Sequence, residues 1–152
     1  MKYRFLTSLF CGFVVFAAAQ TENAKYDKQL ADSLGGDDYG MKTYILVILK
    51  TGPTKIEDKK ISDSLFKGHM ENIGRLAANG KLIVAGPLGK NDKTYRGIFI
   101  FNVKTIEEAN ALLETDPTIK EKVLEAEVFK WYGSAALPMY LPLHEKIQKK
   151  NM

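Results

Sequence analysis

The stretch from His69 to Pro87 constrains the fold more than any other part of the chain, because a helical pattern passes there directly into a strand pattern. Four side chains at helical spacing define one face of the helix: Leu65, His69, Ile73 and Leu76. Three of these are aliphatic, so this face must be buried, and the histidine belongs to it. The pattern therefore predicts a titratable ring on the inward face of a helix.

Turn-forming residues end this helix and delimit the strand that follows. Gly80 accepts the left-handed backbone that closes a last helical turn, and it follows Asn79. The apolar run 82–85 then predicts a short buried strand, which Gly86 and Pro87 end. We therefore expect His69 to lie beside a β-sheet.

The other elements follow from hydrophobic periodicity and from capping signals. They are a strand over 41–50, a helix over 61–78, a strand over 95–103, a helix from the capping box 105–108 to about 114, a short helix from Asp116-Pro117 to about 124, and a strand over 126–132. The order is strand, helix, strand, strand, helix, strand. It predicts an α+β fold, a ferredoxin-like β-α-β-β-α-β domain over 41–133.

The apolar pattern of the first strand also indicates that another protein surface covers the sheet. Positions 44–49 are apolar without interruption, as expected of a central strand that is covered on both faces. A ferredoxin-like domain places its helices on one face of the sheet only, so the second face needs another cover. We expect a homodimer in which two sheets pack face to face.

The first 19 residues have the features of a signal peptide. Lys2 and Arg4 precede an apolar run that ends in small residues at 17–19. We expect cleavage after Ala19 and an exported protein, periplasmic or extracellular, with no stable membrane anchor. An uncleaved anchor and a lipid on Cys11 are the alternatives. Residues 20–40 are expected to be a flexible leader, or else a frayed helix over 23–34, and residues 134–152 a tail that packs on the domain or its partner.

Composition, residue spacing and motifs argue against several kinds of binding site. The formal net charge of +4 falls to about +2 without the signal peptide, and the lysines are dispersed among acidic residues, so no nucleic-acid surface is predicted. Two histidines, no cysteine beyond Cys11 and no closely spaced His/Asp/Glu cluster argue against a metal site. No glycine loop of the phosphate-binding kind follows a strand and opens a helix. We expect neither metal nor cofactor.

His69 and Asp116 remain as candidates for chemistry, provided that their two helices pack side by side. An imidazole titrates near neutrality, and an adjacent carboxylate can orient it as a general acid/base. The structural alternatives are a neutral core histidine with both nitrogens bonded and an aspartate that only caps its helix. Trp131 and Tyr132 are expected to be core or interface aromatics, and His144 a surface residue.

Taken together, these sequence features resemble those of a known protein family. A helix histidine, the run 80–87, Gly97 in a hairpin strand, and Asp116-Pro117 before a strand that contains Trp131 together resemble the YCII-related (YciI-like) family over 41–133. The resemblance implies a ferredoxin-like domain of the dimeric α+β barrel type, with a histidine and an aspartate in a pocket as the active pair. These two fall on His69 and Asp116. One branch of the family is similar to a dehydrochlorinase that acts on chlorinated muconolactones.

Two positions depart from the family pattern. Thr118 stands where an aromatic residue usually follows the Asp-Pro pair, and Phe66 replaces a basic residue one helical turn before the histidine. The leading hypothesis is an exported homodimeric enzyme for lyase- or hydrolase-type chemistry on an unknown small molecule. Its pocket would contain His69 as base and Asp116 as its orienting group, with Gly86 and Pro87 binding the substrate. The alternatives are a non-enzymatic module of the cell envelope that binds a small ligand or a protein, and a domain whose pocket is closed.

Overall fold

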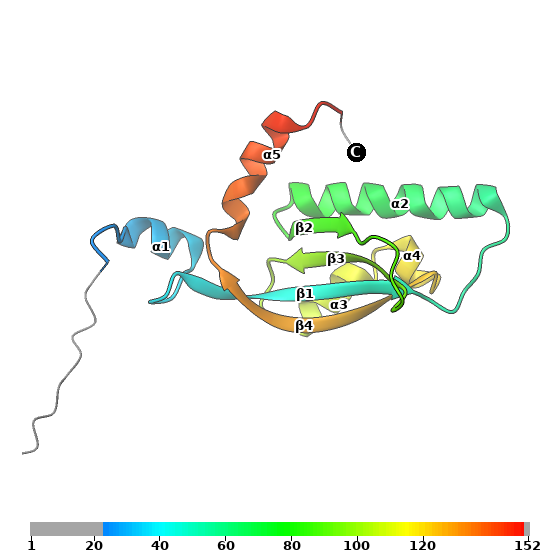
Figure 1. Cartoon of the computed structure of the whole chain (residues 1–152), viewed down its shortest axis with the longest axis horizontal. Coiled ribbons are helices and arrows are strands. Elements are labelled where there is room, and N and C mark those ends of the chain that lie inside the picture. Colours follow the sequence, from blue (N-terminus) through cyan, green and yellow to red (C-terminus); the bar gives the residue numbers. More distant parts are fainter. Residues whose placement is uncertain (1–22, 151–152) are drawn as a thin grey trace, which may run out of the picture.

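The computed structural model describes residues 23–150 and has the predicted order of elements (Figure 1). The elements are α1 (Lys28–Leu34), β1 (Met41–Thr51), α2 (Lys59–Ala78), β2 (Leu82–Pro87), β3 (Tyr95–Phe101), α3 (Ile106–Leu113), α4 (Pro117–Lys120), β4 (Leu124–Ser134), a 3-10 turn (Leu137–Tyr140) and α5 (Leu141–Ile147). Apart from α1 and the C-terminal segment, this is the β-α-β-β-α-β order. The prediction of a ferredoxin-like α+β fold is confirmed.

The sheet has the strand order β2-β3-β1-β4, and each neighbouring pair is antiparallel. β1 is central, as its unbroken apolar run predicted, and it pairs with β4 over its full length. Figure 1 shows α2 running along β2, with α3 and α4 behind the sheet.

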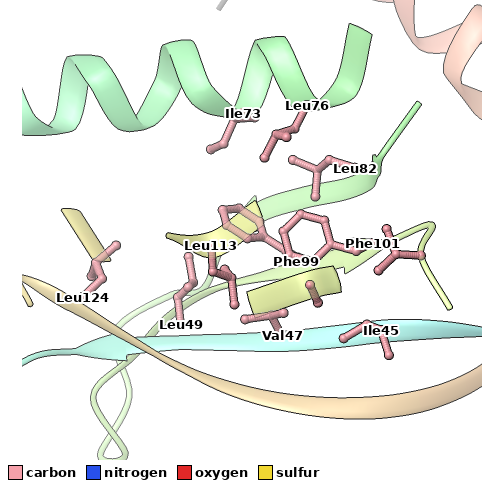
Figure 2. Packing of buried hydrophobic residues seen from close by; sticks show 12 residues of the cluster. Ile45, Val47, Leu49, Ile73, Leu76, Leu82, Phe99, Phe101, Leu113 and Leu124 are labelled. Atoms are coloured by element: carbon pink, nitrogen blue, oxygen red, sulfur yellow. The ribbon is translucent and has the colours of Figure 1, made fainter. Parts of the chain in front are cut away.

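The core fills the layer between the sheet and these helices. Alternate residues of β1, which are Ile45, Val47 and Leu49, face it and are at most 3% exposed. Ile73 and Leu76 reach down from α2 toward the phenyl rings of β3 (Figure 2). The stripe predicted from helical spacing is therefore the one that packs on the sheet.

The opposite face of the sheet is covered only at one end. Leu137 and Leu141 of the C-terminal segment pack there against a cluster of Tyr44, Ile83 and Ile100. The Tyr140 hydroxyl also donates a hydrogen bond to the carbonyl oxygen of Ile83. The tail packs on its own domain, which is one of the two possibilities expected for it.

The short helix before the last strand ends earlier than predicted. Periodicity suggested a helix to about residue 124, but α4 stops at Lys120. Lys122 has a left-handed φ of 56°, and the Val123 amide donates to the carbonyl of Thr118, so the chain turns there. Leu124 then enters the core as the first residue of β4 and is 5% exposed. The free energy gained by burying Leu124 is larger than the free energy gained by continuing an exposed helical turn.

The expected leader contains a helix. Within residues 20–40, the described part forms α1, which is close to the alternative considered for 23–34. Asp27 caps its first turn, and Gly35 ends it with a φ of 69°. The predicted signal peptide lies outside the described residues. Among residues 23–150, no helix has the length and apolarity needed to cross a membrane.

Candidate active site

His69 lies in the third turn of α2 and faces the sheet. The residue is 9% exposed, and its ring stacks on the Phe99 ring of β3 at 5.9 Å between centroids and 26° between planes. The Phe66 ring meets the imidazole edge-on at 6.1 Å. Aromatic contacts on two sides leave the ring one orientation, with its Nδ1 edge toward α4.

Asp116 meets the histidine from the start of α4. Its Oδ2 lies 2.6 Å from His69 Nδ1, and the aspartate is 1% exposed. Its Oδ1 accepts a hydrogen bond from the backbone amide of Thr118 at 2.9 Å, which caps α4. The two interpretations of Asp116 therefore hold together, because one oxygen caps the helix and the other orients the imidazole.

Thr118 is the third residue of the hydrogen-bonded group that contains His69 and Asp116. Its hydroxyl donates to Asp116 Oδ1 at 2.7 Å and lies 3.4 Å from His69 Nδ1, and the residue is fully buried. A small hydroxyl side chain fits there because it supplies a hydrogen bond to the carboxylate.

The hydrogen bonds keep Asp116 ionised. Burial raises the pKa of Asp116, but the hydrogen bonds from His69 and Thr118 lower it by more, so the net pKa lies below the usual 3.8. An ionised carboxylate only accepts hydrogen bonds, so the short contact is Nδ1–H donating to Oδ2. The neutral ring then carries its lone pair on Nε2.

Nε2 is the free end of the imidazole. No hydrogen bond joins it to any residue of the described chain, yet no buried side-chain nitrogen or oxygen there lacks a partner. Nε2 is therefore accessible to solvent. Among the described residues, Nδ1 is therefore the ring nitrogen of His69 that has a hydrogen-bond partner.

A cavity of about 380 Å³ opens beside His69, between α2 and the β2–β3 hairpin. Gly86 and Pro87, expected at the substrate site, belong to its wall, as do Phe66 and Phe99. Asp116 does not line it and lies behind the histidine. The pocket is open, and it reaches the base and not the carboxylate.

Two further contacts hold α4 against α2 on either side of the pair. A Cβ on Gly68 would lie 2.8 Å from Cγ of Pro117, so the glycine permits the close approach of the helices. One turn later, the Arg75 guanidinium and Asn72 bond the hydroxyl of Thr115. Sequence reasoning missed these residues; the Asn72–Arg75 spacing and the glycine beside the histidine were the available signals.

The described residues contain no group of three or more histidine, cysteine, aspartate or glutamate side chains that could hold a metal ion.

Comparison with known proteins identifies a family and similar solved structures. No curated protein matches this chain. A solved structure, 5-chloro-2-hydroxyhydroquinone dehydrochlorinase (TftG) from Burkholderia phenoliruptrix AC1100 in complex with 2,5-dihydroxybenzoquinone, is similar at 21% identity. The likeness covers 57% of this chain and 92% of that one, with a TM-score of 0.41. The model of the YCII-related domain matches residues 43–132, which are more than half of the chain and contain the whole His69–Asp116 site, and the protein therefore belongs to the YCII-related domain family.

Proposed function

We propose that the protein is an enzyme that uses His69 as a general base and acid on a small molecule, without a cofactor. The observation that carries the proposal is the free Nε2 of a carboxylate-oriented imidazole at an open, mainly apolar pocket. A base of this kind must have a fixed tautomer and access to substrate. The contact of Nδ1 with Asp116 supports the first condition, and the position of His69 in the pocket wall supports the second.

The reaction would be of the lyase or hydrolase type. In an elimination, Nε2 takes a proton from an acidic carbon, the C–H electron pair forms the new C=C bond, and a leaving group such as chloride departs with its bonding electrons. In a hydrolysis, Nε2 takes a proton from water while the water oxygen bonds to an electrophilic carbon, and the leaving group departs with the electrons of its bond to that carbon. In both, the Asp116 carboxylate stabilises the imidazolium that forms, and the proton then passes to the leaving group or to solvent.

Proton transfer can be tested before the natural substrate is known. Wild-type protein is incubated in D₂O with a panel of cyclic C–H acids, including lactones and hydroxylated quinones, and deuterium uptake and elimination are followed by NMR. His69→Gln should lose the catalysed exchange, whereas His144→Gln, an exposed histidine on α5, should retain it. Full activity of the His69 variant would remove the mechanism.

The second function is a non-enzymatic module that binds a small ligand or a protein. The apolar lining of the pocket supports it, because such walls bind ligands without any chemistry. In that case a ligand would bind wild type and His69→Gln alike, and neither protein would convert any member of the panel.

We also propose that the active form is a homodimer assembled through the open face of the sheet. This face still presents apolar side chains that are only half-buried or exposed. Leu46, Val84 and Trp131 pack beside the cluster that the tail contacts, and Ile48, Ile98 and Phe129 belong to the rest of the face. A second copy would cover them. Light scattering should give a dimer for wild type and for Ile61→Lys on α2, and a monomer for Phe129→Lys; a wild-type monomer at micromolar concentration would contradict this.

The proposed location is outside the cytoplasm, in the periplasm or the extracellular space. The support is the pattern of residues 1–19. Cell fractionation, with mass spectrometry of the purified protein, should find a chain that begins at Gln20. A full-length chain in the cytoplasm would refute export.

A further inference from the structure

The pocket beside His69 has an unusual distribution of polar groups. Only two of its lining side chains carry nitrogen or oxygen, His69 and Arg96, and the others are aliphatic, aromatic, methionine, proline or glycine. No aspartate or glutamate lines it. A ligand that fills this space must therefore have an apolar body, and the polar group that faces Arg96 must be one that a guanidinium binds.

A β-bulge accounts for the presence of Arg96 at the pocket. Leu49 of β1 lies opposite Gly97, but Lys50 lies opposite Tyr95, so Arg96 is the extra residue of β3. Regular alternation would place its side chain on the face away from Gly97 and the core. A bulge re-aims the side chain of the extra residue, and Arg96 does line the pocket.

The guanidinium of Arg96 is also uncompensated. The residue is exposed, and within residues 23–150 no hydrogen bond or ion pair joins its side chain to another residue. Arg96 also lines a shallow hollow next to the pocket, in which Lys90 is the other charged residue and no acidic side chain occurs. The rim at the β2–β3 hairpin is therefore cationic, and the five N–H donors of Arg96 are available to a ligand.

We propose that Arg96 selects the substrate, and that the substrate is a small ring compound with one anionic oxygen group, such as a carboxylate. The anionic group pairs with Arg96, the ring packs against Phe66 and Phe99, and an acidic C–H faces Nε2 of His69. The proposal rests on the proposed function, since it names the substrate class for the same site. A pocket of about 380 Å³ is near the lower end of ligand sites and suits a single ring with short substituents.

Binding of matched ligands tests this without turnover. Benzoate, salicylate and 4-nitrophenolate are compared with the neutral benzamide and salicylamide, and the ring protons of His69 are followed by NMR during each titration. Wild type should bind the anions about tenfold or more tightly than the amides, which is the loss expected when one charge-assisted pair is removed. Arg96→Gln should bind both sets equally weakly.

Two control variants separate the possible causes of a lost preference for anions. Lys93→Gln removes the same charge from the exposed hairpin loop, outside the pocket lining, and should keep the preference for anions. His69→Gln, followed through the Phe99 ring, should also keep it, so a failure of the catalytic proposal is distinguishable from a failure of this one. The inference is overturned if the anions do not bind, if the amides bind as tightly, or if Arg96→Gln leaves the preference intact.

Discussion

Asp116 caps α4 and also accepts a hydrogen bond from His69, and replacing it tests both roles. Asp116→Ala removes the cap of α4 and the partner of His69 Nδ1 together. Loss of an N-cap costs about 0.5–2 kcal/mol, and a buried Nδ1–H left without an acceptor costs about 1–3 kcal/mol. The expected loss in the free energy of unfolding is therefore about 1.5–5 kcal/mol.

Asp58→Ala is the matched control. Asp58 caps α2 by accepting from the amides of Lys60 and Ile61, and it has no histidine partner. Its loss should cost the cap alone, about 0.5–2 kcal/mol. Urea unfolding of both variants, followed by circular dichroism, measures the difference, which is the joint contribution of the contacts of Asp116 with His69 and with the Thr118 hydroxyl.

Asp116→Asn gives a sharper outcome. Asparagine caps a helix about as well as aspartate, but its amide NH₂ can donate to Nδ1 of His69. The imidazole proton would then move to Nε2, and the pocket would face a donor in place of a base. We expect a stable protein without catalysed exchange, and ¹⁵N NMR of the ring should show the exchanged tautomer. A loss below about 1 kcal/mol in Asp116→Ala, or an unchanged tautomer in Asp116→Asn, would refute the reasoning.

Three other predictions follow from contacts in the structure. Gly68→Ala should destabilise the fold by about 1–3 kcal/mol because its Cβ would overlap the proline ring of α4, whereas Gly74→Ala on the same helix, with nothing within 4 Å, should be neutral or stabilise it by up to about 1 kcal/mol. A hydrogen bond to Asp37 raises the pKa of Tyr132 to about 12, so an absorbance titration should lose its most alkaline tyrosine in Tyr132→Phe. Because the pKa of Asp116 is lower in the folded than in the unfolded chain, its contribution to stability is complete above about pH 4 and declines as the pH falls through the folded value, so acid should destabilise wild type more than Asp116→Asn.

Much of the fold could be predicted because its signals are local. The unbroken apolar run of β1, the stripe on α2 and the Thr105 capping box each depend on residues within one or two turns, and the structure has the corresponding elements. The length of α4 could not be predicted in this way. Leu124 fits a helical pattern as well as a strand, and its burial beside β1 decides between them.

The sequence by itself determined that His69 lies on the buried face of a helix and that Asp116 caps another, because periodicity and capping are properties of neighbouring residues. Only the tertiary structure decided that the two side chains meet. They are 47 positions apart, and their 2.6 Å contact depends on the approach of α4 to α2 at Gly68. Arg96 likewise reads as an outward strand residue, and the bulge that turns it to the pocket exists only through pairing with β1. Distances of this kind are set by the packing of whole elements, which no local pattern encodes.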